Sequence, residues 1–350
     1  MNIYDYVKSY TESMSEKEFN EVDNLVLSCL TYLDFTGIVP QNKTYLSLED
    51  AGRIYLDTYK KRDIAKIGIA QRDAYKLLEL VIASPRFKSI GVSRYRYITS
   101  LDSQFSAMTF KIDKHLKFIG FEGTDELLSG WKEDAYISFK FPVDAQQYAI
   151  DYINEAVSLF DSKIIVGGHS KGGNLALVAS MFANPLLKHK VKRVYSNDGP
   201  GLRKEEYESN KYKKIKPKYT HIIPTHSLIG TLLYNDEYVV VKTTNKNILA
   251  HTASSWVIED DHFVYAKQDK KSIQIEKKLN EYIASISYSE QKRIVDAIFR
   301  DLEHQGYKTV NDFLNLRKLL KSIKNLKNID PTIKDTLIEV VEIIITNYVI

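Results

Sequence analysis

The amino-acid sequence predicts an α/β fold with a mainly parallel central sheet, N-terminal helices and a helical C-terminal region. Strand-like and helix-like segments alternate between residues 145 and 244, which is the pattern of parallel strands joined by crossover helices. Residues 1–80 and 266–350 follow mostly helical patterns. The chain has 350 residues, 44% of them hydrophobic, enough to bury a large core. We therefore expect an α/β domain over residues 1–265 and a helical region over residues 266–350.

The N-terminal part supplies one clear helix and three strand candidates. Between residues 22 and 33 the apolar side chains recur at the spacing of one helix face; they are Val22, Leu25, Val26, Cys29, Leu30 and Leu33. Segments rich in Ile, Tyr, Phe and Val follow, separated by turn-forming residues, at residues 89–99, 106–112 and 116–123. These segments should form the first strands of the sheet.

The alternating region opens with a helix pattern at residues 145–160. A helix rich in Ala, Leu and Val is expected at residues 171–182. The strands are expected at residues 163–168, 192–197, 219–224 and 237–244. This order indicates crossover connections that cover both faces of the sheet.

Composition and charge argue against several classes of protein. A formal net charge of +4 is too weak to indicate a nucleic-acid-binding protein. Cys29 is the only cysteine, so an intramolecular disulfide cannot form. No run approaches the ~18–20 apolar residues of a membrane span, and the N-terminal segment lacks the features of a signal peptide. We expect a cytoplasmic protein, with leaderless export left open, and no metal or other cofactor, because no cluster has metal-ligand spacing.

One segment carries the strongest chemical signal. Residues 168–172 read Gly-His-Ser-Lys-Gly, which fits the pattern G-x-S-x-G, and they lie between an apolar strand and a helix. In this pattern the serine occupies a tight turn, and the flanking glycines avoid collisions with the neighbouring strand and helix. The segment therefore predicts an α/β-hydrolase fold with Ser170 as the nucleophile.

Two other interpretations of this segment are weaker. A phosphate-binding P-loop needs its lysine after the last glycine, whereas Lys171 precedes Gly172 and Gly173. A purely structural turn, with Ser170 as a helix N-cap, is the alternative without catalysis.

A serine hydroxyl needs a base that takes its proton. His251 lies in a loop after the last predicted strand, which is where the base of such a hydrolase is expected. His262 is the second candidate, although its two aspartate neighbours also suit a solvated residue. His221 falls inside a predicted strand, and His226 precedes the expected strand. We expect His251 Nε2 within hydrogen-bond reach of Ser170 Oγ, with a looser contact allowed in the absence of ligand.

The base in turn needs an acid that orients it. Asp198 follows the strand after the nucleophile's helix, at the edge of the sheet where the site of an α/β protein forms. The surrounding Asp-Gly-Pro-Gly also suits a simple turn. Asp236 is the alternative acid, although it looks more like a turn residue. We expect Asp198 to contact His251 Nδ1.

The oxyanion of the reaction needs two backbone N–H donors, each worth ~2.7–4 kcal/mol of transition-state stabilisation. Lys171, directly after the nucleophile, should supply one of them. The glycine turn at Gly123 makes Thr124 the second donor, and the Thr124 hydroxyl could add a further contact. His169 should point into the protein in a structural role.

Several of these segments resemble one family. The similar stretches are residues 121–135, 168–176, 195–202 and 250–256, with weaker likeness at 19–40 and 222–233. They are similar to an incompletely characterised family of α/β-hydrolase-like proteins, common in Gram-positive bacteria and related to the class 3 (triacylglycerol) lipases. The resemblance covers most of residues 1–265 and implies that Ser170 is the nucleophile, Thr124 the oxyanion residue and His251 the base.

Two positions depart from the class 3 lipases that this resemblance invokes. Glu122 stands where those enzymes usually have arginine. Ser227 lies in the segment where their acid follows the next strand. The resemblance therefore implies that the acid has moved to Asp198, or that the site is a dyad or inactive.

Two kinds of segment bear on the substrate and on membranes. Residues 121–143 could cover the site as a lid, with Leu127, Leu128 and Trp131 either as its apolar face or packed on the core.

Basic residues collect at 211–219 and at 316–328. In the second segment Leu316, Leu319, Leu320, Ile323 and Leu326 form a stripe opposite lysines and Arg317. Such a helix can lie on an anionic bilayer, although more often the stripe packs on the domain and the charges stay solvated.

Together these observations predict a serine hydrolase that cleaves carboxylic esters, with lipid acyl esters as the expected substrates. The expected partners are a lipid or small ester substrate and a peripheral membrane surface, with no nucleic acid. A hydrolase-fold protein that has lost catalysis and acts as a binding or regulatory module is the alternative from another class. An acyl transferase or a peptidase could use the same serine.

Overall fold

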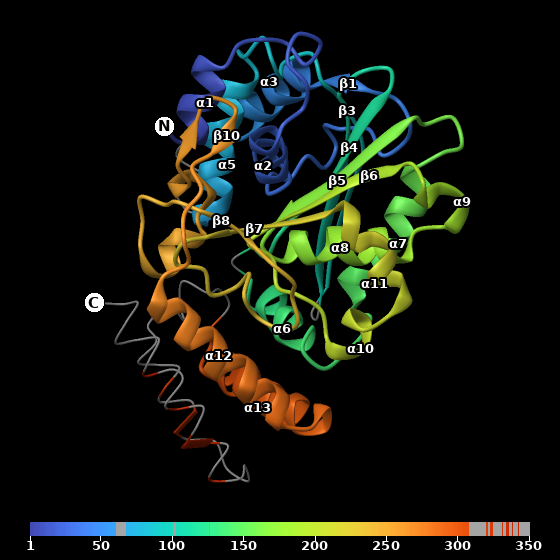
Figure 1. Ribbon diagram of the computed structural model, residues 1–350. Coiled ribbons are helices and arrows are strands. Elements are labelled where there is room, and N and C mark those ends of the chain that lie inside the picture. The colour runs from blue at the N-terminus through green and yellow to red at the C-terminus, as the bar shows by residue number, and fades with distance from the viewer. Residues whose placement is uncertain are drawn as a thin grey trace.

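The computed structural model describes residues 1–60, 68–100, 103–125 and 127–307, with single positions beyond residue 307 and only the backbone of residues 247 and 248. Its centre is a sheet of eight strands whose spatial order follows the chain order (Figure 1). The first four strands pair antiparallel, and the pairs from β4 to β8 are parallel. The strands are β1 (Leu46–Ser47), β2 (Gly91–Thr99), β3 (Gln104–Lys111), β4 (Leu116–Phe121), β5 (Lys163–His169), β6 (Val191–Asn197), β7 (Tyr219–Pro224) and β8 (Val239–Val241).

Each predicted strand lies in this sheet. β3 is buried along all but its last residue, because helices cover both faces of the sheet at this strand. β8 is shorter than the expected strand over residues 237–244. The chain beyond it is held by single bridges instead, from Val241 to Tyr265 and from Thr243 to Trp256.

The sequential strand order decides where the crossover helices lie. Right-handed crossovers between successive neighbours place their helices on the same face of a sheet. Helices α7 (Asp144–Ala156), α8 (Lys171–Phe182) and α11 (Asn210–Ile215) accordingly share one core with that face. The shorter helices of these crossovers are α6 (Leu128–Tyr136), α9 (Pro185–Lys188), α10 (Lys204–Tyr207) and the 3₁₀ turn η1 (Lys216–Lys218).

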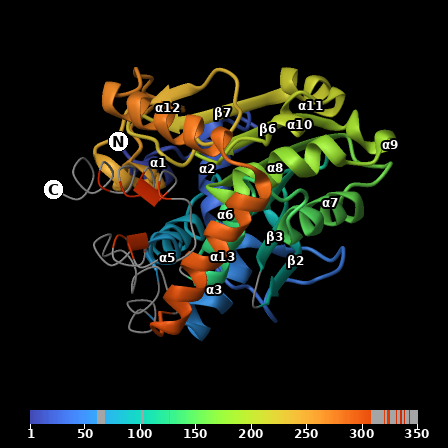
Figure 2. The same ribbon diagram turned by 90° about the horizontal axis from the view of Figure 1, so that it is seen from below.

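The opposite face is covered by the N-terminal helices, which form a second core with the sheet (Figures 1 and 2). They are α1 (Ile3–Ser9), α2 (Glu21–Leu30), α3 (Leu48–Thr58) and α5 (Ile69–Val81). In α2, nine of the ten residues are buried, so the helix is central to the core rather than exposed along one side. Its buried charge, Asp23, is paired with Arg86, with an Nη2–Oδ2 distance of 2.5 Å.

After β8 the chain crosses the carboxyl ends of the strands and continues into two helices. The elements are η2 (Asn247–His251), η3 (Ala253–Ser255), β9 (Ile258–Glu259), β10 (His262–Phe263), α12 (Lys270–Ser285) and α13 (Tyr288–His304). α13 packs on α6 through Leu128, Phe299 and Leu302 (Figure 2). The basic segment expected at residues 316–328 lies almost entirely outside the described residues.

The protein has an α/β-hydrolase fold, as the sequence predicts. Five strands run parallel from β4 to β8, helices cover both faces, and β5 passes directly into α8. The carboxyl ends of these strands form one edge of the sheet, where the loops can build a site. Within the described ranges, no helix combines the length and the apolar character needed to cross a bilayer.

Candidate active site

Ser170 occupies the turn between β5 and α8 in a backbone conformation that side chains rarely adopt, with φ of 58° and ψ of −133°. Close packing explains the glycines. A Cβ on Gly168 would lie 2.2 Å from the carbonyl carbon of Gly172, and a Cβ on Gly172 would lie 2.2 Å from the carbonyl oxygen of Phe121. The Ser170 N–H donates to the Asn197 carbonyl at 2.9 Å, which fixes the turn against the end of β6.

Asp198 and His251 meet at the carboxyl edge of the sheet. Asp198 Oδ2 lies 2.6 Å from His251 Nδ1. The other oxygen, Oδ1, accepts from Ser227 Oγ at 2.5 Å and from the Gly230 N–H at 3.1 Å. The carboxyl group is fully buried, so three donors hold it in one position. With its Nδ1–H directed at a carboxylate, a neutral His251 keeps its Nε2 lone pair free to accept a proton.

Ser227 lies in the segment where class 3 lipases have their catalytic acid, and here it contacts the acid candidate Asp198. Its hydroxyl donates to Asp198. The carboxylate that reaches the imidazole therefore comes from the end of β6, and the loop after β7 contributes a hydroxyl that supports it.

His169 holds the backbone of the His251 loop. Its Nε2 lies 2.8 Å from the His251 carbonyl oxygen, and its Nδ1 lies 2.9 Å from Tyr32 Oη. Burial, together with the neighbouring His251, lowers the pKa of His169 to about 3, so the ring is neutral. Nε2 is then the donor to the carbonyl, and Nδ1 accepts from the Tyr32 hydroxyl. His169 has the structural position that the sequence predicts, whereas Tyr32 was not anticipated.

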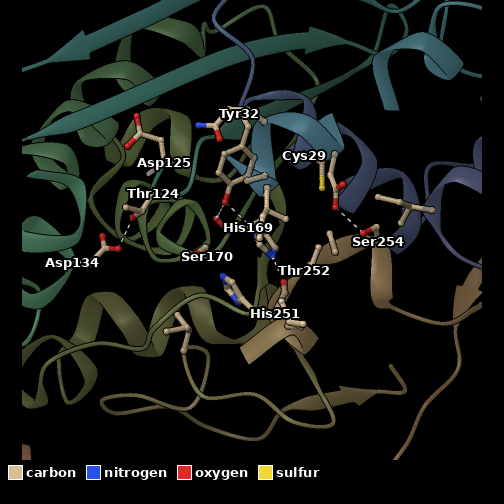
Figure 3. A pocket seen from close by; sticks show the side chains of 18 of the residues that line it. Cys29, Tyr32, Thr124, Asp125, Asp134, His169, Ser170, His251, Thr252 and Ser254 are labelled. Carbon is tan, nitrogen blue, oxygen red and sulfur yellow. Dashed lines mark hydrogen bonds between the residues drawn. The ribbon is translucent and has the colours of Figure 1, made fainter. Parts of the chain in front are cut away.

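Ser170 and His251 line the same cavity (Figure 3) but form no hydrogen bond with each other. Across the ranges that the structure describes, Ser170 Oγ has no hydrogen-bond partner. The expected hydrogen bond between the two side chains is therefore missing in this resting arrangement. Catalytic hydrogen bonds are often long without ligand and tighten when substrate binds.

The turn after β4 presents backbone donors near the nucleophile. No acceptor among the described residues binds the N–H of Thr124 or of Lys171. A side chain at Gly123 would collide with its neighbours, because a Cβ there would lie 1.9 Å from Tyr32 Oη and 2.6 Å from the His169 carbonyl oxygen. The Thr124 hydroxyl donates to Asp134 Oδ2, so it is already engaged rather than free for a further contact.

The Lys171 side chain is buried beneath this turn. Its Nζ donates to the Gln104 carbonyl at 2.8 Å and lies 3.3 Å from Glu133 Oε2. Glu133 Oε1 accepts from Ser103 Oγ at 2.8 Å and from the Ala145 N–H at 2.9 Å. The pair connects α8 to α6. Sequence reasoning missed Glu133, although a lysine at a buried helix start implies a buried carboxylate partner.

Three carboxyl groups surround the same turn and retain protons more strongly than usual. Burial raises the pKa of Asp134 to about 6 and also raises the pKa of Asp125. Burial, with the nearby Asp125 charge, raises the pKa of Glu122 well above its ordinary value. Glu122 is only 4% exposed at the position where class 3 lipases usually have arginine, so the chain places a buried acid there.

The cavity beside Ser170 has a volume of about 200 Å³ and a mostly apolar lining (Figure 3). One wall comes from the N-terminal helices and the rest from loops at the carboxyl edge. Its apolar side chains are Ile3, Cys29, Ile69, Ala70, Trp131, Ile229, Leu249 and Ala253. Asp73, Asp125 and Asp134 also line it, and no arginine or lysine does among the described residues.

The segment proposed as a lid divides its apolar side chains between two surroundings. Trp131 lines the cavity, and its Nε1 donates to the Asp125 carbonyl at 3.0 Å. Leu128 is buried against α13, whereas Leu127 is 36% exposed. Leu128 is therefore packed on the rest of the protein, whereas a lid role for Trp131 and Leu127 stays a prediction.

The other histidines lie elsewhere. His221 is buried within β7, and His226 lies 3.9 Å from Asp269. The His262 side chain is 46% exposed beside Asp261.

The alternative acid, Asp236, contacts no imidazole among the described residues. It accepts from Tyr207 Oη at 3.0 Å, from the Tyr212 hydroxyl and from Lys216 Nζ at 2.8 Å. No group of His, Cys, Asp and Glu in the described ranges could hold a metal ion.

A family model described as Mbeg1-like matches residues 81–300, well over half of the chain. The chain belongs to the Mbeg1-like family. The match places it in a lipase-related family, as its resemblance implied. The matched range of this Mbeg1-like chain includes Ser170, Asp198 and His251. Helices α1 and α2 and most of α5, which build one wall of the cavity, lie outside it.

Two solved structures are similar to this Mbeg1-like chain. M37 lipase is 13% identical, with a TM-score of 0.36, over 59% of this chain and 68% of that one. The native propeptide complex of Rhizomucor miehei lipase is 15% identical, with a TM-score of 0.33, over 45% of this chain and 58% of that one. No curated protein matches the sequence.

Proposed function

We propose that this protein is a cytoplasmic serine hydrolase that cleaves carboxylic esters, with lipid acyl esters as its substrates, through Ser170, His251 and Asp198. The observation that carries the proposal is the 2.6 Å contact between Asp198 Oδ2 and His251 Nδ1 in the loops around a strained serine. A buried carboxylate that orients an imidazole has a clear chemical use beside a hydroxyl that needs a base.

In this proposal Ser170 Oγ attacks the ester carbonyl carbon while His251 Nε2 takes the hydroxyl proton. Asp198 stabilises the resulting imidazolium. The N–H groups of Thr124 and Lys171 bind the oxyanion. The attack produces a tetrahedral intermediate that carries this oxyanion. Its collapse breaks the ester C–O bond, and the alcohol leaves with the proton from His251. Water then repeats the sequence on the acyl-enzyme, releases the carboxylic acid and restores Ser170.

The lining of the cavity supports an uncharged acyl group as the part of the substrate that is bound. Its apolar side chains suit a hydrocarbon chain. Asp73, Asp125 and Asp134 line the cavity and no lysine or arginine does among the described residues, so an anionic group beside the nucleophile would meet no cationic side chain of these two types. Lipid acyl esters partition into membranes, so we include contact with a membrane surface in the proposal.

A second function has one observation in its favour. Ser170 Oγ has no hydrogen bond to His251. A hydrolase-fold protein that binds ligands in this cavity without cleaving them would have no need of that contact.

A fluorophosphonate probe, which reacts with activated serines, separates the two functions. We expect labelling of the wild-type protein and none of Ser170→Ala, with hydrolysis of a soluble p-nitrophenyl ester reduced at least about a thousandfold. Ser180→Ala is the matched control, because Ser180 lies on the same helix and its hydroxyl donates to the Ala176 carbonyl. A folded wild-type protein that stays unlabelled would support the binding protein instead. Products from esters, amides and thioesters then distinguish an esterase from a peptidase or an acyl transferase.

A further inference from the structure

The amino ends of the parallel strands form the edge of the sheet opposite the candidate active site, and this edge is rich in lysine. We call it the basic edge and define it by the loop at residues 157–162, helix α9, the start of β6 and helix α11 with η1. Lys218 Nζ joins these elements, because it donates to the Val191 carbonyl at 2.7 Å and to the Lys188 carbonyl at 3.5 Å. The lysines of the basic edge, counting Lys163 at the start of β5, are Lys163, Lys188, Lys190, Lys192, Lys211, Lys213, Lys214, Lys216 and Lys218.

Most of these lysines lack acidic partners. Lys216 pairs with Asp236 at 2.8 Å, and the other eight form no ion pair within the described ranges. Burial and the charges of Lys211, Lys214 and Lys218 lower the pKa of Lys188, and burial and Lys192 lower the pKa of Lys218. Lys188 and Lys218 are therefore close enough to neighbouring lysines to be repelled by them.

Two further carboxylates near this edge, Asp161 and Asp113, are already engaged. Asp161 lies 2.6 Å from Lys117 Nζ, and Asp113 Oδ1 accepts from the N–H groups of His115 and Leu116. The whole chain has a net charge of only +4, with 49 basic and 45 acidic residues, so the positive charge is concentrated locally.

Apolar side chains project from the same edge. Phe160 is 98% exposed, Leu186 70% and Leu159 67%, more than any other large hydrophobic side chain in the described ranges. They belong to one surface, because Lys190 Nζ donates to the Leu159 carbonyl at 2.8 Å and the Lys190 N–H donates to the Leu187 carbonyl at 2.9 Å. Large apolar side chains exposed to this degree usually mark a surface that is covered in function.

We propose that the basic edge docks on an anionic lipid bilayer, with Leu159, Phe160 and Leu186 inserted among the lipids and the lysines bound to the headgroups. The presence of lysines together with exposed apolar side chains on one surface favours a bilayer as the partner. A nucleic acid would neutralise the lysines but leave the three apolar side chains in water, whereas a bilayer interface accepts both. The surface deepens the membrane contact of the proposed function but does not depend on catalysis.

The position of the basic edge also determines how the candidate active site would be oriented relative to the bilayer. β5 has seven residues from Lys163 to His169 and so separates this edge from Ser170 by roughly 20 Å. Docking would hold the cavity toward the aqueous side. If the proposed hydrolysis is correct, the site then suits single-chain esters that leave the bilayer better than lipids that stay embedded in it.

Vesicle co-sedimentation of the full-length protein tests the surface. We expect binding to phosphatidylcholine vesicles that contain phosphatidylglycerol, little binding to phosphatidylcholine alone, and weaker binding as salt is raised. Lys211→Glu with Lys214→Glu should weaken binding at least about twentyfold, at about fivefold per lysine. Leu159→Ser with Phe160→Ser should weaken it at least about tenfold.

The matched control is Lys270→Glu with Lys271→Glu, which makes the same charge change on α12 and should bind like the wild type. An equal loss in this control, or no binding of the wild type to anionic vesicles, would overturn the proposal. A loss with the lysine variants but not with the serine variants would also overturn it, because the apolar side chains would then not enter the bilayer. Hydrolysis of a soluble ester should be unchanged in all these variants, so its absence from the wild type would count against the enzyme and not against the docking surface.

Discussion

Asp198 offers a test of charge at a single residue. In Asp198→Asn the retained oxygen can still accept from Ser227 and Gly230, but the negative charge beside His251 Nδ1 is gone. We expect kcat on a soluble ester to fall about ten-thousandfold, because the imidazolium loses its partner and the ring loses the correct tautomer. Steady-state kinetics with a thermal unfolding curve would measure this. Asp236→Asn is the control, and an Asp198→Asn enzyme within about tenfold of the wild type would refute the assignment.

Asp134 should make the free energy of unfolding depend on pH, and Asp134→Asn should remove this dependence. Burial raises its pKa from 3.8 to about 6, so the folded protein binds this proton more tightly than the unfolded chain. The stabilisation is complete below the unfolded pKa and is lost as pH rises through the folded pKa. Asp134→Asn removes the loss. Urea titrations should therefore show the variant gaining about 1–2 kcal/mol over the wild type between about pH 4 and pH 7. A difference that does not vary with pH would contradict this.

The conformation of a single residue was predictable from the sequence where the residues next to it in the chain determine it. The conformation of Ser170 follows from the two glycines at Gly168 and Gly172, because only they fit so close to α8 and β4. The engagement of the Thr124 hydroxyl was not predictable in the same way, because its acceptor, Asp134, lies ten positions later in a helix.

At the level of elements, the Lys171–Glu133 pair joins α8 to α6 in the interior. Lys171→Met leaves the Glu133 carboxylate buried without its cation, and we expect a loss of about 3–5 kcal/mol in the free energy of unfolding. Adding Glu133→Gln should recover most of this loss, because the amide oxygen can still accept from Ser103 and Ala145. Urea unfolding of the single and double variants measures the coupling. Equal losses in Lys171→Met and the double variant would show that the two side chains do not act as a pair.

Most elements were predictable from periodicity, and the exceptions have tertiary causes. α8 begins and ends at the predicted residues, Lys171 and Phe182. α2 was expected to bury one face, yet its polar side chains are buried as well. Asn24 reaches Asn197 at 2.9 Å, and Asp23 reaches Arg86, so these polar groups find partners from distant segments.

At the scale of the whole molecule, the cavity exists only because the N-terminal helices close it against the loops of the carboxyl edge. Cys29 on α2 forms part of this wall. Cys29→Phe should reduce the space of about 200 Å³ and lower kcat/KM for p-nitrophenyl decanoate, relative to butyrate, at least about tenfold. Cys29→Ala removes the thiol without adding bulk and is the control. An unchanged ratio of the two esters in a folded Cys29→Phe protein would mean that the acyl chain does not occupy this wall.

The spatial order of the strands and the covering of the second sheet face also depend on the whole chain. Alternating strands and helices predicted a parallel sheet but not its order. Successive neighbours place α7 and α8 on one face, so the other face needs helices from elsewhere in the chain, and residues 1–81 supply them.

The sequence by itself determined the turn that carries Ser170, most of the strands and helices, and the α/β-hydrolase fold. These depend on local sterics and on the period of apolar residues, which short segments express directly. Only the tertiary structure decided that Asp198 reaches His251 across 53 positions, that Ser227 supports that carboxylate, and that Tyr32 holds His169 across 137 positions. Such contacts depend on how separate elements pack, and no local pattern in the chain records the direction of a side chain that meets a distant partner.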